Sequence, residues 1–357
     1  MDIDIVITWV DGSDPAWLAE KAKYLPPAER DSNSPDRNRD WGLLPYWFRS
    51  IEKFAPWART VHFVTWGHVP EFLDLEAPRL HVVRHEEFIP AEYLPTFSSH
   101  AIEMHLHRIP GLAEHFIYFN DDMFLLRPMQ ETDFFRDGLP CTYGAEVPWE
   151  FNGRLGVCAY AAANDLAAVN AHFPKRKFGY VSRSKYINRR YRWQDNVRTW
   201  MLQKLFPDYF TGFQNLHAPA PYLRKTFETV WLAEPYLLDS TSRNRFRTAG
   251  NANQWLFLWW QVACGDFSPC MVDNLVMCVD DDTLEDLCSA IVYQKHAMVC
   301  IDDPEWEVPA EELSYWLRKA FHSILPEKSI FEKDGFEEEF LEPDGSEPAD
   351  GSEPAGH

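Results

Sequence analysis

Two adjacent carboxylates at the end of a hydrophobic run are the side chains of this chain that point most directly to chemistry. The apolar residues 116–119 are followed at once by Asn120, Asp121 and Asp122. In open α/β sheets, ligands bind just beyond the carboxyl ends of the strands. Neighbouring carboxylates repel each other and are costly to desolvate without a cation, and a Mg²⁺ or Mn²⁺ ion on substrate phosphates removes both problems. A turn in which an Asp caps the next element would explain the same residues.

The N-terminus has a second strand end of this kind. Residues 3–10 alternate as a strand does, and Asp11 follows, with Gly12 allowing a tight turn. Two further apolar segments end near a histidine, residues 61–66 before His68 and residues 80–83 before His85. If these strands are parallel neighbours, the two histidines and the three aspartates lie along one edge of the sheet.

A predicted helix over residues 99–109 offers a phosphate site. Ser98 and Ser99 stand at its start, where serine caps a helix and where phosphate also binds, so two roles remain open for them. Glu103 and His107 are four residues apart on this helix and would face one way. They could form a metal pair or a structural pair that supports the rim.

Polar groups in the second half of the chain could act on an anionic substrate. Residues 172–208 are predicted to be helical and basic, which fits either a solvated helix face or a landing surface for an anionic donor or acceptor. His217 lies in a loop fixed by Pro219, which suits a general base. The apolar residue Val272 is followed by Asp273 and Asn274, which could add metal ligands.

Bulk properties narrow the class of protein. The 357 residues have a net charge of −21, which argues against nucleic acid or an anionic membrane as a general partner. Seven cysteines without a C-x-x-C pair favour a reducing cytoplasm over a disulfide framework. The longest apolar run, residues 255–260, predicts a core helix because it is too short to span a bilayer. Since Met1 leads almost at once into a strand, we expect no signal peptide.

We expect one catalytic domain over residues 1–325. Its first half, residues 1–135, would bind nucleotide and metal, and residues 136–325 would bind the acceptor and phosphate. Residues 326–357 are rich in Asp and Glu and end in short repeats of Gly, Ser, Glu and Pro, so they are predicted to be an acidic, largely disordered tail.

Four blocks of this sequence resemble the Stealth family of sugar-phosphate transferases. That family includes bacterial capsule and exopolysaccharide phosphotransferases and the catalytic subunit of the animal enzyme that marks lysosomal proteins with GlcNAc-1-phosphate. The matching blocks are residues 5–15 (IVITWVDGSDP), segments from Arg39-Asp40 to Asn120-Asp121-Asp122, a looser region around His217 and residues 245–260, and residues 270–274 (CMVDN). The chain departs from the family at Ala220, where relatives have a second His, and over residues 41–45.

The resemblance implies transfer of a hexose- or HexNAc-1-phosphate from a nucleotide-diphosphate sugar to a hydroxyl of an acceptor glycan, in capsule or exopolysaccharide synthesis. It implies an α/β, Rossmann-like fold with a mostly parallel sheet, related to the GT-A glycosyltransferases, and helical additions in the C-terminal half. The donor and the glycan acceptor would be the partners, and peripheral association with a polysaccharide assembly complex is left open.

Phosphoryl transfer needs positioning and charge neutralisation more than covalent chemistry, which suggests a role for each candidate residue. Mg²⁺ or Mn²⁺ would be held by Asp121, Asp122, Asp273 and Asn274. Arg39 and Arg247 would offset charge on the phosphate, with Arg245 as the alternative to Arg247. His217 would take the proton of the acceptor hydroxyl, and Asp11 would orient the nucleotide or a metal-bound water. The remaining substrate-binding candidates are Asp40, Ser98, Ser99 and Asn120.

Two other functions fit the same residues. A metal-dependent glycosyltransferase would break the sugar C1–O bond and release a nucleoside diphosphate, whereas the phosphotransferase would release a monophosphate. A non-catalytic carbohydrate-binding protein would rely on the aromatic residues, but sugar binding alone does not need clustered carboxylates at strand ends.

Overall fold

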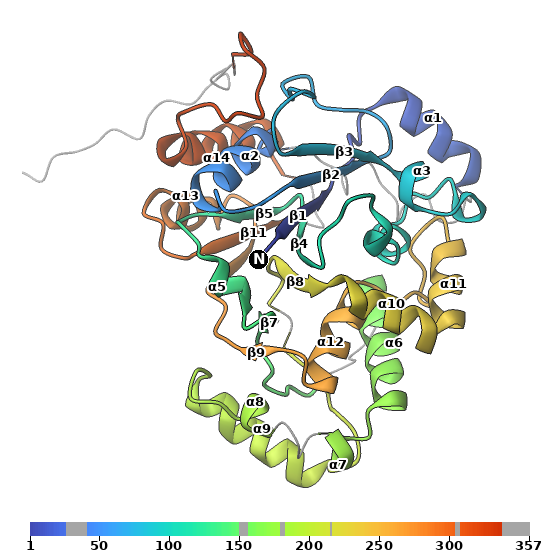
Figure 1. The fold of residues 1–357 in the computed structure, drawn as a ribbon. Helices are drawn as coiled ribbons and strands as arrows, with labels where there is room; N and C mark the ends of the chain where they lie inside the picture. Colours follow the sequence, from blue (N-terminus) through green and yellow to red (C-terminus); the bar gives the residue numbers. More distant parts are fainter. Residues whose placement is uncertain (26–40, 150–155, 179–182, 215, 304–307, 338–357) are drawn as a thin grey trace, which may run out of the picture.

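The computed structural model describes residues 1–25, 41–149, 156–178, 183–214, 216–303 and 308–337. Its centre is a five-stranded sheet in the order β3-β2-β1-β4-β8, in which β1 to β4 are parallel and β8 runs antiparallel to β4 (Figure 1). Two three-stranded sheets, β10-β11-β5 and β6-β7-β9, lie beside it. The predicted α/β, Rossmann-like class with a mostly parallel sheet is confirmed.

The strands are short, as is usual for such a sheet. Their bounds are β1 Ile3–Thr8, β2 Val61–Thr65, β3 Leu80–Arg84, β4 His115–Asn120, β5 Met123–Leu125, β6 Phe135–Arg136, β7 Leu139–Thr142, β8 Ala220–Leu223, β9 Ser268–Pro269, β10 Asn274–Cys278 and β11 Met298–Asp302.

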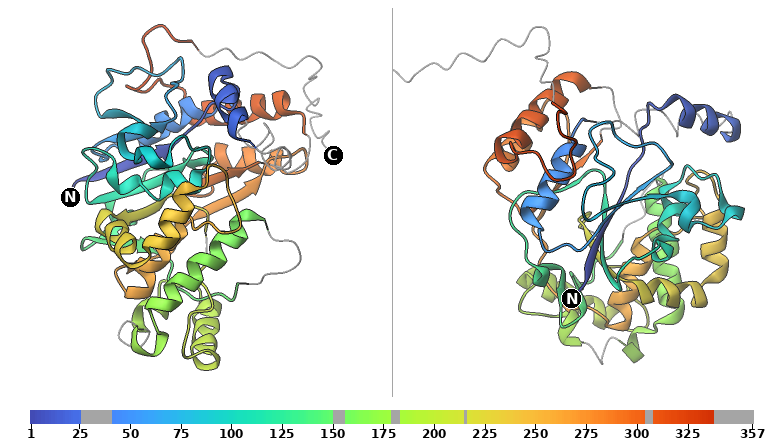
Figure 2. Two further views of the ribbon diagram at one scale, coloured as in Figure 1. Left: turned by 90° about the vertical axis from the view of Figure 1, so that its right-hand side faces the viewer. Right: turned by 45° about the horizontal axis from the view of Figure 1, so that its top comes forward.

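Helices cover both sides of the central sheet (Figure 2). In the first half they are α1 Pro15–Tyr24, α2 Leu44–Phe54, α3 His85–Phe88, α4 Ser99–Glu103 and α5 Glu131–Phe134, with the 3₁₀ turns η4 Ala91–Tyr93 and η5 Leu106–Arg108. In the second half they are α6 Val157–His172, α7 Lys175–Phe178, α8 Arg183–Tyr186, α9 Trp193–Leu205, α10 Arg224–Ala233, α11 Pro235–Arg243, α12 Trp255–Cys264, α13 Leu284–Val292 and α14 Ala310–Ile324.

Alternation along β1 divides the hydrophobic core between the two faces of the sheet. Ile5 and Ile7 pack on one face with Trp47 of α2 and with α14, whereas Val6 packs on the other face with Phe257 of α12. The apolar run at residues 255–260 is the buried first part of α12, as expected for a core helix. The helix ends at Gly265, whose φ of 85° is the left-handed conformation that glycine adopts readily.

The predicted helix over residues 99–109 is wrong in its extent. The chain forms the short helix α4, passes through Met104 and His105, and then makes the 3₁₀ turn η5. Glu103 and His107 therefore do not share a helix face. His107 packs against Phe227, with ring centroids 5.7 Å apart, while Glu103 accepts a hydrogen bond from the backbone of Gln254. The metal-pair alternative for these two residues has no support in this geometry.

The packed structure extends beyond the boundary expected at residue 325. Phe331 is fully buried in the core, and the carboxylate of Glu332 accepts two hydrogen bonds, at 2.8 and 2.7 Å, from the guanidinium of Arg49 on α2. Both side chains are almost completely buried. Removing one partner of such a pair leaves a desolvated charge without compensation. The rest of the expected tail, residues 338–357, lies outside the described residues.

We expect Glu332→Ala to lower the free energy of unfolding by about 3–5 kcal/mol, because it removes the carboxylate that pairs with the buried guanidinium of Arg49. Urea denaturation followed by circular dichroism measures this change. The matched control is Glu337→Ala, which removes an exposed carboxylate and should change stability by less than about 0.5 kcal/mol. Equal effects of the two substitutions would contradict a structural role for the pair.

Candidate active site

The carboxyl ends of the parallel strands meet at one edge of the sheet, as the sequence predicts. Thr8 of β1 pairs with Asn120 of β4, so Asp11 and Asp121 follow neighbouring strand ends. The backbone N–H of Asp11 donates to Nε2 of His68 at 2.8 Å. The carboxylate of Asp11 accepts hydrogen bonds from the backbone and the hydroxyl of Ser13. These contacts fix the loop after β1 at the rim.

Asp122 lies where the chain leaves one sheet and enters another. β4 ends at Asn120 in the central sheet, and β5 begins at Met123 in the sheet with β10 and β11. The backbone N–H of Ile301 on β11 donates to the carbonyl of Asp122 at 2.9 Å. Asp122 is thereby held between the end of β4 and the end of β11.

This position makes Asp122 an unusual carboxyl group. Its pKa is raised to about 7, chiefly by burial and also by the carboxylates of Asp302 and Asp303, while a hydrogen bond with the thiol of Cys300 opposes the rise. Its Oδ1 atom is buried and has no hydrogen-bond partner within the described residues. An orphaned carboxylate oxygen near two other carboxylates fits a hard divalent cation, which prefers oxygen ligands. The residues present therefore suit Mg²⁺ or Mn²⁺.

His217 faces Asp122 across a short gap. Its Nε2 lies 3.9 Å from Oδ2 of Asp122, and each side chain is about one-third exposed. These two groups and the thiol of Cys300 converge within 4.8 Å. Burial lowers the pKa of His217, although Asp302 and Glu103 partly oppose this. The imidazole is therefore neutral near pH 7 and can accept a proton.

The loop that carries His217 is held in place from the start of β10. The side-chain amide of Asn274 donates to the carbonyls of Leu216 and His217, both at 2.9 Å. His217 has a φ of 41°, a conformation that is unfavourable for a residue with a side chain and that these contacts help to hold. The Oδ1 atom of Asn274 is buried without a hydrogen-bond partner among the described residues, which leaves an oxygen available to a ligand.

Arg247 provides positive charge on another side of the site. Its Nη2 donates to Oγ of Ser99 at 2.8 Å, and Ser99 also contacts the buried carboxylate of Glu103. Both Arg247 and His217 act electrostatically on Glu103, where they oppose the rise in its pKa that burial causes. Glu103 thus links the arginine to the histidine beneath the rim.

The segment Arg245-Phe246-Arg247 turns its two arginines to different surroundings. Phe246 is buried and stacks on Phe97, with ring centroids 5.5 Å apart. The guanidinium of Arg245 lies 4.6 Å from the ring centroid of Tyr24 on α1, whereas Arg247 contacts Ser99. Of the two candidates, Arg247 is the one that the fold places beside the Glu103–His217 cluster.

The other predicted residues are spread around this centre. Asp121 is exposed beside Asp122, and Asn120 is half-buried at the end of β4. The hydroxyl of Ser98 is buried without a hydrogen-bond partner in the described part of the chain and does not cap α4. Asp273 binds Arg127 and His296 with its carboxylate and does not join the Asp122 cluster. Arg39 and Asp40 lie outside the described residues.

The sequence analysis missed the acidic end of β11. Met298 to Ile301 form a buried run that stops at Asp302 and Asp303, the same signal that singled out Asp121 and Asp122. Asp303 accepts a hydrogen bond from the indole N–H of Trp41 at 2.7 Å. The signal was available, but nothing in the sequence indicated that β11 would lie against the turn after β4.

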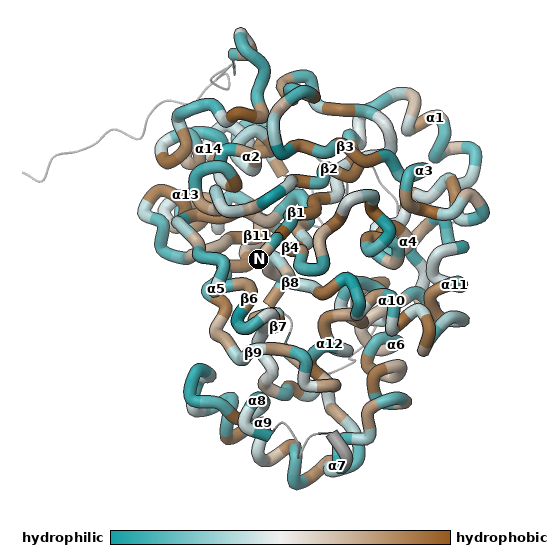
Figure 3. Tube along the Cα trace, viewed as in Figure 1, coloured by the Kyte–Doolittle hydropathy of each residue, from teal (hydrophilic) through white to brown (hydrophobic). Residues whose placement is uncertain are grey.

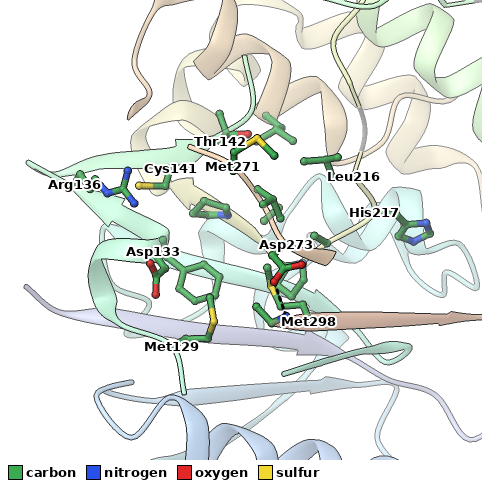
Figure 4. Close-up of a pocket in the computed structure, with 18 of the residues that line it drawn as sticks. Met129, Asp133, Arg136, Cys141, Thr142, Leu216, His217, Met271, Asp273 and Met298 are labelled. Atoms are coloured by element: carbon green, nitrogen blue, oxygen red, sulfur yellow. Dashed lines mark hydrogen bonds between the residues drawn. The ribbon is translucent and has the colours of Figure 1, made fainter. Parts of the chain in front are cut away.

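A cavity of about 260 Å³ lies behind the His217 loop (Figure 4). Its polar lining includes Arg127, Asp133 and Arg136, and its apolar lining includes Met271 and Met298. The ring of His217 points away from the cavity.

Comparison with known proteins identifies the family. Stealth protein conserved region 1 (CR1) matches residues 1–26, and Stealth protein conserved region 2 (CR2) matches residues 37–141. The capsular polysaccharide phosphotransferase WcwK of Streptococcus pneumoniae is 37% identical over 339 residues, covering 93% of this chain and 99% of the relative. The chain belongs to the Stealth family. The matched regions of this Stealth protein contain Asp11, Asp122 and Ser99, while His217 and Arg247 lie beyond them.

Two further relatives cover this Stealth protein to a similar extent. The receptor polysaccharide phosphotransferase WefC of Streptococcus oralis is 36% identical over 334 residues, covering 92% of this chain and 99% of the relative. The exopolysaccharide phosphotransferase cps2G of Lactiplantibacillus plantarum is 35% identical over 337 residues, covering 93% and 96%. Like these relatives, the protein is an enzyme of the phosphotransferase class. In the parts of the chain that the structure describes, no helix has the length and apolar character needed to cross a membrane.

We expect divalent cations to displace a proton from Asp122, because a carboxyl group with a pKa of about 7 is largely protonated at pH 6 and ionised at pH 8.5. Below pH 7 the affinity for Mn²⁺ should fall about tenfold for each pH unit. Isothermal titration calorimetry in buffers of different ionisation enthalpy measures the protons released.

In this experiment Asp122→Asn should abolish cation binding and keep the folded circular dichroism spectrum. Asp281→Asn, which changes an exposed acid on a surface turn, should bind as the unchanged protein does. Binding without proton release at pH 6, or binding retained by Asp122→Asn, would remove Asp122 from the set of ligands.

Proposed function

We propose that this enzyme transfers a hexose- or HexNAc-1-phosphate from a nucleotide-diphosphate sugar to a hydroxyl of an acceptor glycan. The product is a phosphodiester, and the leaving group is a nucleoside monophosphate. Support comes from the names of the relatives, which are capsular, receptor and exopolysaccharide phosphotransferases. We therefore place the reaction in the synthesis of capsule or exopolysaccharide.

The observation that carries the proposal is the short distance between a neutral histidine and a half-buried carboxyl group. His217 lies 3.9 Å from Asp122, with Arg247 on Ser99 nearby through Glu103. Transfer of a phosphoryl group to a hydroxyl needs a proton acceptor, negative ligands for a cation and a fixed positive charge for the phosphate. This site brings together one candidate for each role.

The bond changes follow from these positions. The acceptor hydroxyl oxygen attacks the phosphorus that carries the sugar, and its proton moves to Nε2 of His217. The bond from that phosphorus to the bridging oxygen of the diphosphate breaks, and the nucleoside monophosphate leaves with the electron pair. Arg247 offsets the negative charge that develops on the phosphate oxygens, and the carboxylate of Asp122 stabilises the imidazolium of His217.

A divalent cation, when bound, would neutralise charge on the diphosphate and on the leaving group. We propose that Asp121, Asp122 and the free amide oxygen of Asn274 would hold it. Asp273 is a weaker candidate because its carboxylate binds Arg127 and His296. Cys300 is a poor ligand for these ions because burial, chiefly, raises the pKa of its thiol, so the sulfur keeps its proton.

We propose roles for three further candidate residues. Asp11 would orient the nucleotide or a bound water at the rim, with Arg39 and Asp40 as further substrate contacts.

We place the enzyme in the cytoplasm, which the free thiols of all seven cysteines support, since a reducing compartment keeps thiols unpaired.

We expect Arg247→Ala to lower kcat by about 10²–10³-fold, because it removes the positive charge beside Ser99. Arg245→Ala is the matched comparison: it is two residues away and its guanidinium lies over Tyr24, so the loss in kcat should be much smaller. Steady-state kinetics on purified variants measures both. The opposite order would assign the phosphate contact to Arg245.

The released nucleotide tests the reaction itself. Incubation with a panel of UDP- and GDP-sugars, an acceptor glycan and Mg²⁺ or Mn²⁺ should release nucleoside monophosphate and give a new phosphodiester signal in ³¹P NMR. His217→Ala should lower the rate by about 10²–10⁴-fold while donor binding persists. Release of nucleoside diphosphate would instead establish a glycosyltransferase, and a monophosphate without a phosphodiester would indicate hydrolysis.

A further inference from the structure

Helix α9 exposes most of its apolar residues and buries two polar ones, unlike an ordinary surface helix. Its buried residues are Asp195, Thr199 and Leu202, while Trp193, Val197 and Leu205 are exposed. Asp195 is held inside by a hydrogen bond from Tyr143, and Thr199 accepts a hydrogen bond from the backbone N–H of Glu146. The orientation of α9 is therefore fixed by specific contacts.

The exposed apolar residues form a single stripe. Their helical spacing places them on one face, opposite the buried residues. The stripe comprises Trp193 (71% exposed), Val197, Trp200, Met201 and Leu205 (66% exposed). A shallow hollow of about 540 Å³ continues it between α9 and α8, with Ile187 and Arg183 in its lining. A continuous apolar stripe of this kind on a folded protein usually marks an interaction surface.

Positive charge surrounds the stripe in a protein that is otherwise acidic. Residues 183–205 contain seven Arg or Lys residues and one acidic residue, Asp195, whereas the whole chain has a net charge of −21. Arg183, Arg189 and Arg192 are exposed at the start of α8 and before α9, and Lys204 is exposed within the stripe itself. Long basic side chains beside apolar residues can extend to a charged layer above them.

We infer that the surface formed by α8 and α9 docks onto an anionic lipid bilayer. Two tryptophans with Leu, Met and Val on one helix face, rimmed by arginines, match what an interfacial helix presents to the boundary between headgroups and acyl chains. The local positive charge matches the negative surface of such a membrane and overrides the acidic average of the chain. A two-fold contact with a second copy would set these arginines against one another, so the positive charge favours an anionic lipid surface.

The position of the surface allows such docking. α7, α8 and α9 form one end of the molecule, beyond β7 and β9 and away from β1 to β3 (Figures 1 and 2). Along α9, hydrophobic and hydrophilic residues alternate at this end (Figure 3), as expected for a helix with an apolar stripe among charged residues. Docking through this end would leave the edge of the central sheet with Asp122 uncovered. The inference does not depend on the proposed reaction.

The test is co-sedimentation of the full chain with vesicles of phosphatidylcholine alone and with vesicles that contain phosphatidylglycerol. We expect binding to the anionic vesicles at low salt, and strong weakening at high salt, because exposed charges are screened. Trp193→Ser/Leu205→Ser and Arg189→Glu/Arg192→Glu should each reduce binding by about tenfold or more. Circular dichroism melts establish that each variant is folded.

Matched controls come from another exposed apolar site. Leu232 on α10 and Tyr236 on α11 are 86% and 90% exposed, so Leu232→Ser/Tyr236→Ser removes two exposed large side chains elsewhere, and Lys225→Glu reverses a single exposed charge there. Both control variants should leave vesicle binding unchanged. Equal binding to neutral vesicles, no binding to either kind, or binding lost only in the controls would overturn the inference. A dimer that the α9 variants dissociate, without vesicle binding, would replace lipid with a second copy.

Discussion

The partial burial of one carboxyl group at the junction of two sheets is the constraint on which the rest of the site depends. Asp122 follows β4 directly, and the main chain there is hydrogen-bonded to β11, so its side chain cannot turn fully to solvent. Burial disfavours the charged form of this carboxyl group, and the nearby carboxylate of Asp302 disfavours it as well. The neutral His217 and the thiol of Cys300 lie next to Asp122, and the Oδ1 atom of Asp122 has no hydrogen-bond partner among the described residues. A cation or a proton can therefore balance the charge of this carboxyl group.

The acidic and the basic groups of the site are held by different parts of the fold. The acidic side comes from the ends of β4 and β11, which are fixed by main-chain pairing. The basic side comes from Arg247, whose direction is set by the stacking of Phe246 on Phe97 and by its hydrogen bond to Ser99. Glu103 interacts with both Arg247 and His217 and also accepts a hydrogen bond from the backbone N–H of Gln254 at the start of α12. Phosphoryl transfer requires such fixed separation, since preorganised charges need no rearrangement during the reaction.

Two departures from ordinary burial are the ones that we connect with function. Asp122 is a half-buried acid whose Oδ1 atom has no hydrogen-bond partner among the described residues, and Trp193 on α9 is a large apolar residue held in an exposed position. Each has a free-energy cost that the surrounding contacts must offset, and departures from local consistency are expected at functional sites. The first lies in the site to which we assign the phosphotransferase activity named for the Stealth relatives. The basic charge around Trp193 on α9 is the basis on which we infer an anionic lipid partner.

The sequence by itself determined the four parallel strands of the central sheet and the presence of Asp11, Asp121 and Asp122 at strand ends, because alternation, turn residues and apolar runs act over a few residues. It also carried the family resemblance. Tertiary structure alone decided that β11 brings Asp302 to Asp122, that Arg247 rather than Arg245 faces the site, and that α9 turns its tryptophans outward. These outcomes depend on pairing between residues more than 100 positions apart and on which helix face finds a partner, and no local pattern encodes either.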